Sequence, residues 1–112
     1  FSFEIKQTVA AGGYFDFDFP VGFDVAVSGG TFESRNVELY VNGTPRTASD
    51  TLSATLDQVV ITSGDGGSIR YNLNTTTGVS ANSDIEFRIG NHTSNSRQAG
   101  SSFSSTRNHY LG

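Results

Sequence analysis

Apolar and polar side chains alternate along residues 12–27. In the first half of this run, Phe15, Phe17 and Phe19 are separated by single aspartates. Successive side chains of an extended strand point to opposite faces of a sheet. The three phenylalanines are therefore expected to enter a core while the aspartates face water. The run predicts a β-sheet with one buried face.

The same alternation recurs along the chain and predicts about seven strands. They are expected at residues 1–9, 14–19, 23–27, 36–41, 59–62, 69–73 and 84–89. Turn signals at spacings of about ten residues are typical of a β-sandwich. The fold class is therefore predicted to be all-β, an antiparallel β-sandwich. Odd-numbered bulky side chains from Phe1 to Ile89 are expected to line one dry interior.

Three connections carry specific expectations. Residues 10–13 are expected to form a short hairpin connection. Asn42-Gly43 is the strongest signal in the chain for a type I′ turn. Residues 47–56 leave alternatives open: Leu52, Ala54 and Leu56 alternate as in a strand, whereas residues 47–50 could instead form a loop, or a helical turn capped by Ser49 or Asp50.

Composition excludes several classes of function. The net charge is −4 and Lys6 is the only lysine, which disfavours binding to nucleic acid. The absence of cysteine excludes disulfides and thiolate metal sites. No apolar run approaches the roughly 20 residues of a membrane span. Because the chain starts at Phe1 inside an alternating strand, we expect a processed product or the ordered part of a longer extracellular protein.

The sequence divides into two parts. Residues 1–90 are predicted to form the β-sandwich domain, and residues 91–112 a polar loop or tail. Only Ala99 and Phe103 are apolar in this tail before Tyr110-Leu111, which could begin a further strand. We therefore expect the sandwich to be completed by a strand from a neighbouring chain, with self-association or association of neighbouring repeats through sheet edges.

Three segments carry a family resemblance. They are Ala11-Gly12-Gly13, Phe17-Asp18-Phe19-Pro20-Val21-Gly22-Phe23 and Ile85-Glu86-Phe87-Arg88-Ile89-Gly90-Asn91. With these segments the chain resembles the immunoglobulin-like repeats of large secreted and surface-layer proteins of archaea and candidate-phylum bacteria. The resemblance implies an immunoglobulin-like fold and a structural or adhesive role in a filament, pilus or surface layer at the cell surface. It supplies no active-site residues.

One pair of carboxylates could suggest catalysis. Asp16 and Asp18 lie on one strand face, about 7 Å apart by the strand rise. Glycosidases use two carboxylates at comparable separations. Two aspartates on an open strand face are more typical of the water-facing side of a sheet, so no catalytic residue and no enzyme activity are predicted.

The same aspartates could contribute to a calcium site. Asp65, within a glycine-rich turn, could join Asp16 and Asp18, or Asp50 and Asp84, in an oxygen cage. The alternative is a simple turn, because glycine and aspartate tolerate positive φ. A structural Ca²⁺ is the only cofactor that the sequence suggests.

Loop residues suggest modification sites. Asn42, Asn74 and Asn91 each begin an Asn-x-Ser/Thr sequon in a predicted loop, so they are candidate glycosylation sites. His92 and His109 fall in the polar tail and are expected to be solvated.

Outward aromatic residues support a second hypothesis. Strand parity places Tyr14 and Tyr40 on outer faces, together with Glu38, and Tyr110 is a further candidate. Such rings could stack on sugars. The alternative function is therefore a carbohydrate-binding module or adhesin domain, with glycans as partners.

Overall fold

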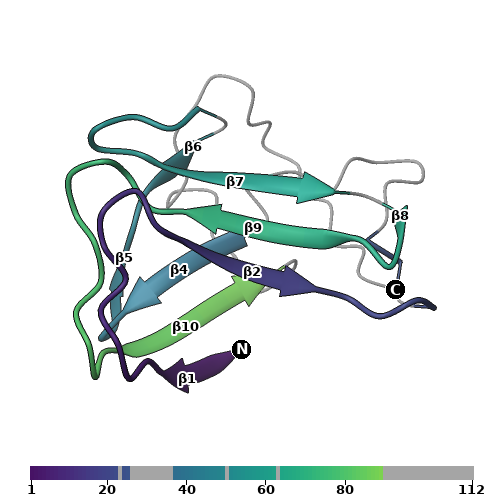
Figure 1. Ribbon diagram of the computed structural model, residues 1–112, viewed down its shortest axis with the longest axis horizontal. Helices are drawn as coiled ribbons and strands as arrows, with labels where there is room; N and C mark the ends of the chain where they lie inside the picture. Colours follow the sequence, from purple (N-terminus) through teal and green to yellow (C-terminus); the bar gives the residue numbers. More distant parts are fainter. Residues whose placement is uncertain (23, 26–36, 50, 63, 90–112) are drawn as a thin grey trace.

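The computed structural model describes residues 1–22, 24–25, 37–49, 51–62 and 64–89. All regular secondary structure in these residues is β-strand, and two four-stranded sheets face each other (Figure 1). The all-β prediction is confirmed. The described residues contain no helix of the length and apolarity that a membrane crossing requires.

Each sheet combines strands from distant parts of the chain. The first sheet has the order β1 (Ser2–Glu4), β10 (Asp84–Ile89), β4 (Val37–Val41), β5 (Thr44–Pro45). The second has the order β2 (Tyr14–Asp18), β9 (Ser68–Asn72), β7 (Asp57–Thr62), β6 (Ala48–Ser49). A separate two-stranded ribbon pairs β3 (Asp24–Val25) with β8 (Gly64–Asp65). The strands are more numerous than the sequence predicted, because pairings of only two residues form ladders of their own.

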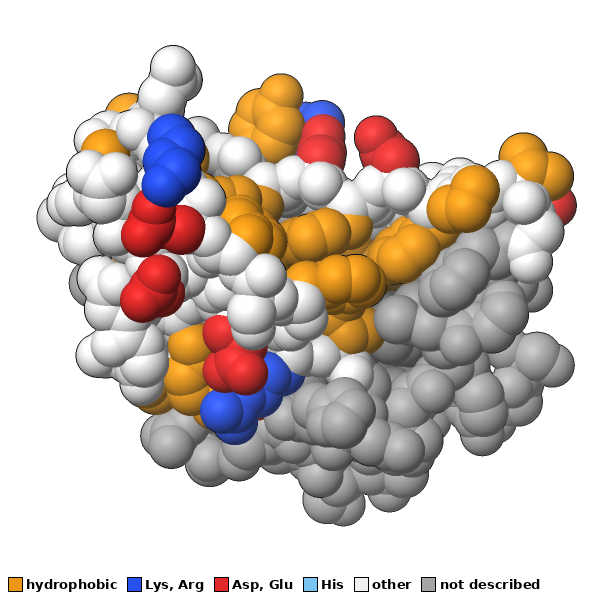
Figure 2. Space-filling view, turned by 90° about the horizontal axis from the view of Figure 1, so that it is seen from below, with side chains coloured by type: hydrophobic (Ala, Val, Ile, Leu, Met, Phe, Trp, Pro, Cys, Tyr) orange, Lys and Arg blue, Asp and Glu red, His pale blue; other side chains and the backbone are white. Residues whose placement is uncertain are grey.

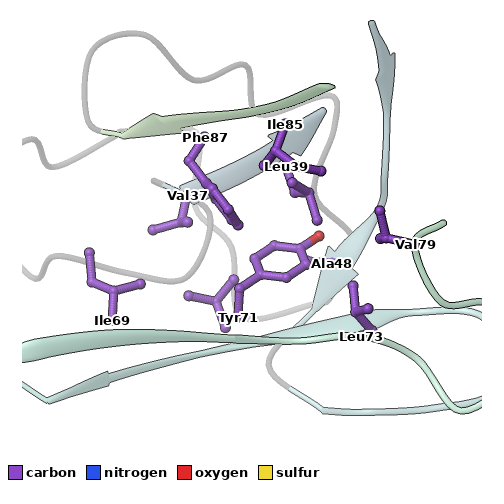
Figure 3. Close-up of a cluster of buried hydrophobic side chains, with 10 residues drawn as sticks. Val37, Leu39, Ala48, Ile69, Tyr71, Leu73, Val79, Ile85 and Phe87 are labelled. Carbon is purple, nitrogen blue, oxygen red and sulfur yellow. The ribbon is translucent and has the colours of Figure 1, made fainter. Parts of the chain in front are cut away.

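The core lies between the two sheets (Figure 3). Leu39 of β4 and Phe87 of β10 face Ile69 and Tyr71 of β9, and all four side chains are buried. Each such side chain contributes about 1.5–3 kcal/mol by leaving water. These residues have odd numbers, so the alternation in the sequence identified the core face of the central strands correctly.

The connection at residues 10–13 does not form a hairpin, as the sequence had suggested. Strand β1 pairs with β10 and β2 pairs with β9, so this connection crosses from one sheet to the other. Val9 forms an isolated bridge to Val79, with backbone N–O distances of 2.9 and 2.8 Å. A tight turn follows, in which Gly13 N donates to Ala10 O. Turn residues thus mark a change of direction without identifying the sheet in which the next strand lies.

The expected turn at Asn42-Gly43 is present. Both residues have positive φ, 50° and 81°, as a type I′ turn requires. The turn joins β4 to β5, with Val41 opposite Thr44. The type I′ turn is therefore confirmed.

Segment 47–56 contains the short strand β6 at residues 48–49, whereas the alternating residues 52–56 form no strand, and its described residues contain no helix. Strand β6 runs parallel to β7, so the second sheet is mixed and the expectation of a purely antiparallel sandwich was wrong. The chain changes sheets between β5 and β6, within a few residues. Arg46 N donates to Leu39 O on one side of this crossing, and Asp57 N donates to Thr47 O on the other.

Strand β4 departs from the predicted alternation. Glu38 and Tyr40 were expected to face water, yet both are buried. Because β4 lies between β10 and β5, side chains of the neighbouring strands flank its outer face. Arg88 of β10 is directly opposite Glu38 and also covers the Tyr40 ring at 4.0 Å. The alternation identified the two faces of β4, but it could not predict that Arg88 would cover the outer face.

We expect Gly78→Ala to destabilise the fold more than Gly43→Ala. A Cβ at position 78 would overlap the carbonyl oxygen of Val9 and disturb the bridge to Val79. A Cβ at Gly43 meets open space, so its cost is limited to the positive φ, about 1–2 kcal/mol. Urea unfolding of both variants measures the difference. Equal midpoints would show that the loop around Gly78 adjusts without loss.

Candidate functional site

The edge strands β1 and β2 lie on the same side of the molecule, each at the end of its own sheet. Phenylalanine rings bridge the gap between them. Phe1 stacks on Phe17 with ring centroids 5.7 Å apart, and Phe3 meets Phe15 at 6.4 Å. We call these four residues the aromatic seam. Figure 2 shows hydrophobic side chains forming a hollowed band across this face of the molecule.

Phe87 lies beneath the seam. Its ring centroid is 4.6 Å from that of Phe17, 5.5 Å from that of Phe15 and 6.4 Å from that of Phe3. The first two contacts are edge-to-face, an arrangement that aromatic quadrupoles favour. The seam is therefore continuous with the core rather than a separate surface patch.

The seam is only partly shielded from water. Phe1 is 64% exposed and Phe3 is 40% exposed, while Phe15 and Phe17 are half-buried. The expectation of one dry interior from Phe1 to Ile89 was therefore wrong at this side. The reason is topological: within the described strands none pairs with both β1 and β2, so inward-facing rings at the two edges reach solvent.

The ladder geometry shows which backbone groups face outward at these edges. Leu73 N donates to Gly13 O at 2.8 Å, and Phe19 N donates to Gly67 O at 2.9 Å. In an antiparallel pair, hydrogen-bonded positions alternate with positions whose N–H and C=O groups point away. The even-numbered residues of β2, from Tyr14 to Asp18, therefore turn their backbone groups away from β9. An added strand could pair with these groups.

The outer face of β2 carries an ion pair and a stacked ring. Arg70 donates two hydrogen bonds of 2.8 Å to Asp16, and its guanidinium lies 4.0 Å from the centre of the Tyr14 ring. The hydrogen bonds from Arg70 lower the pKa of Asp16 below its usual value. Asp16 is thus an ionised structural partner of Arg70, and Asp18 beside it is exposed.

The aspartates suggested for calcium lie apart in the structure. Asp16 is engaged by Arg70, whereas Asp65 accepts a hydrogen bond from Gly22 N in the loop beside the β3–β8 ribbon. Within the described ranges, no three acidic or histidine side chains gather in a way that could hold a metal ion. The calcium site stays a prediction without a geometric basis in these residues.

The two tyrosines suggested for sugar stacking differ in exposure. Tyr14 is 52% exposed, with Arg70 over its ring. Tyr40 is only 7% exposed, and its hydroxyl accepts a 3.1 Å hydrogen bond from Arg88. Tyr40 is therefore unavailable as a stacking surface.

The sequons also differ. The side chain of Asn42 is exposed at the hairpin and accepts a hydrogen bond from Asp84 N. Asn74 is buried, and its side-chain oxygen accepts hydrogen bonds from Thr76 N and Thr77 N. Asn91 and both histidines lie outside the described residues.

A buried polar cluster joins the sheet crossing to the core. Asp57 is completely buried, and Arg46 donates to its two oxygens at 2.6 and 2.9 Å. The Tyr71 hydroxyl and Asn74 N also donate to Asp57, at 2.8 and 2.7 Å. Arg46 further donates to Thr77 O at 2.9 Å. The cluster binds the β5–β6 crossing, β7, β9 and the following loop together.

Nothing in this cluster resembles a reactive site. Four donor atoms, from Arg46, Tyr71 and Asn74, hydrogen-bond to the Asp57 carboxylate. Burial, together with the charge of Asp57, raises the pKa of Tyr71 far above its usual range. Tyr71 therefore stays protonated as a donor. The cluster is a structural anchor.

The sequence analysis did not identify this anchor, although a signal existed. Asp57 has the same parity as Val59 and Ile61, so it lies on the inward face of β7. A carboxylate at an inward position needs a cation or several donors to offset its burial. The sequence could not identify Arg46 as the cation that pairs with Asp57, because Arg46 belongs to no predicted strand.

Comparison of the chain with protein-family models, with curated proteins and with solved structures gave no match in any of the three. The resemblance to immunoglobulin-like surface repeats therefore stays a prediction.

We expect Asp57→Ala to destabilise the protein strongly. The substitution leaves Arg46, whose side chain is 13% exposed, without its anion. Breaking a buried pair in this way costs about 3–5 kcal/mol. The exposed pair provides the control, because Asp16→Ala should cost less than about 1 kcal/mol. Chemical denaturation measures both, and similar losses for the two variants would contradict the anchoring role.

Tyr71 should also make the fold sensitive to alkali. Above the ordinary tyrosine pKa of 10.0, the unfolded chain releases this proton while the folded chain retains it. Stability then falls by about 1.4 kcal/mol per pH unit from this group. Tyr71→Phe should show a shallower decline between about pH 9 and pH 11 than wild type. Urea unfolding across this range provides the measurement, and parallel declines for Tyr71→Phe and wild type would refute the assignment.

Proposed function

We propose that this chain is an interaction module that associates with neighbouring chains through its open sheet edges, as a structural component of an extracellular filament, pilus or surface layer. The aromatic seam is the observation that carries the proposal. It combines exposed phenylalanine rings with two strand edges on one side of the molecule.

Strand addition would satisfy both features of the seam together. Backbone groups of the even-numbered residues of β2 point toward the open edge, where an extended segment can pair with them. Alternate side chains of that segment would cover Phe1 and Phe3, which are exposed in the isolated chain. Main-chain hydrogen bonds would supply the affinity for the added strand, and the aromatic seam would select apolar side chains in it.

The described residues favour binding over catalysis. Several of their ionisable side chains form structural pairs, such as Arg46 with Asp57 and Arg70 with Asp16. We therefore propose no enzymatic activity. The cell-surface location is part of the same proposal and is supported by the resemblance of the sequence to secreted repeats.

The carbohydrate-binding alternative is less well supported. It relied on a row of outward tyrosines, and of Tyr14 and Tyr40 only the first is exposed. A glycan-array screen of the intact chain tests it, and Tyr14→Ala should abolish any binding that depends on ring stacking.

Self-association through the seam can be tested with a matched pair of substitutions. Phe3→Glu places a charge in the seam, whereas Val60→Glu places one at a similarly exposed residue of β7 (40% and 42% exposed). Sedimentation of the full chain should show association that increases with concentration. Phe3→Glu should abolish it and Val60→Glu should preserve it.

Circular dichroism must show that both variants are folded. A wild-type chain that stays monomeric at every concentration would overturn the proposed function. Equal association of the two variants would show that the contact lies elsewhere.

A further inference from the structure

The charge of the β2 edge limits what can pair with it. Asp16 and Asp18 lie on the outer face of this strand, and their backbone groups point toward the open side. A strand added here would set its own outward side chains beside these carboxylates, about 4.5–5.5 Å away between Cβ atoms. Its inward side chains would meet Phe15 and Phe17. The edge therefore favours a segment with basic and apolar residues.

The same geometry disfavours symmetric pairing of two β2 strands. In an antiparallel β2–β2 contact, aspartates of both copies would share one sheet face. Like charges directly opposite each other destabilise a sheet. Arg70 offsets Asp16 within each chain, but Asp18 is exposed. A contact between different segments of two copies avoids this repulsion.

The chain itself contains a stretch of suitable charge. All eleven carboxylates lie in residues 1–90, whereas residues 91–112 contain Arg97 and Arg107 and no acidic residue. The same stretch includes Phe103 and Tyr110 as aromatic residues. A second copy can therefore supply a cationic, aromatic segment to an acidic and aromatic edge.

We propose that the aromatic seam binds this basic segment, residues 91–112, of a second copy, and that the exposed Asp18 selects it by charge. This inference rests on the proposed strand-accepting function. Because the two contacting surfaces differ, the association is heterologous, and such contacts build open filaments when the rotation between copies does not close a ring.

Peptide binding tests the charge selection directly. The probe is a labelled synthetic peptide with the sequence of residues 97–112, titrated with the full chain. A second peptide carries the charge reversals Arg97→Glu and Arg107→Glu. We expect saturable binding of the first peptide and about tenfold weaker binding of the second. The difference should shrink at high salt.

A charge swap on the receptor completes the experiment. Asp18→Lys should weaken binding of the basic peptide and improve binding of the acidic one. Asp84→Lys provides the control, because Asp84 is exposed at the start of β10 and not on β2. It should leave the preference for the basic peptide unchanged.

The outcomes separate this inference from the proposed function. If association depends on Phe3 but binding is unaffected by the charge changes in the peptide and at Asp18, the seam is still the contact. The inference that it selects a basic segment is then wrong. A monomer whose own segment excludes the peptide would also overturn it. Failure of both peptide binding and Phe3-dependent association would overturn the proposed function as well.

Discussion

The Phe87 ring is the contact on which both the core and the seam depend. It is buried between the sheets, 5.5 Å from the Tyr71 ring of the opposite sheet, and it also supports Phe15 and Phe17 at the edge. Aromatic packing therefore continues from the interior to the exposed edge without a polar boundary. This continuity explains why the edge stays apolar although it faces water, since the same rings that line the seam also cover the core.

The buried Arg46–Asp57 pair has a different role from the aromatic packing. Apolar contacts favour a compact sandwich but distinguish poorly between alternative strand arrangements. The bidentate hydrogen bonds from Arg46 to Asp57 fix the point at which the chain leaves one sheet and enters the other. Tyr71 and Asn74 supply the remaining donors, so the charges are buried with their hydrogen bonds satisfied.

Alternation in the sequence was sufficient to predict the strand type and the core face of the central strands. Leu39 and Phe87 occupy the positions that parity assigned to them. Parity could not predict which strands become neighbours, and so it missed both the crossing at residues 10–13 and the parallel pairing of β6 with β7. Those features depend on contacts between residues that are distant in the sequence.

The same limit applies to the site. The phenylalanines were recognised, but the exposure of Phe1 and Phe3 follows from the separation of β1 and β2 into different sheets. Asp16 was recognised as water-facing, but its pairing with Arg70 depends on the register of β2 against β9.

The pairing of β1 with β10 also determines how the domain would respond to mechanical load. The amino group of Phe1 donates to Phe87 O, and β10 ends two residues later at Ile89. Residues 1 and 89 therefore lie at the same end of the β1–β10 ladder. Tension applied through these two ends would open the hydrogen bonds one after another, as in a zipper. A pulling force through residues 1 and 89 would therefore peel the strands apart at low load. Chains linked in series would withstand more force if a lateral contact carried the tension in shear.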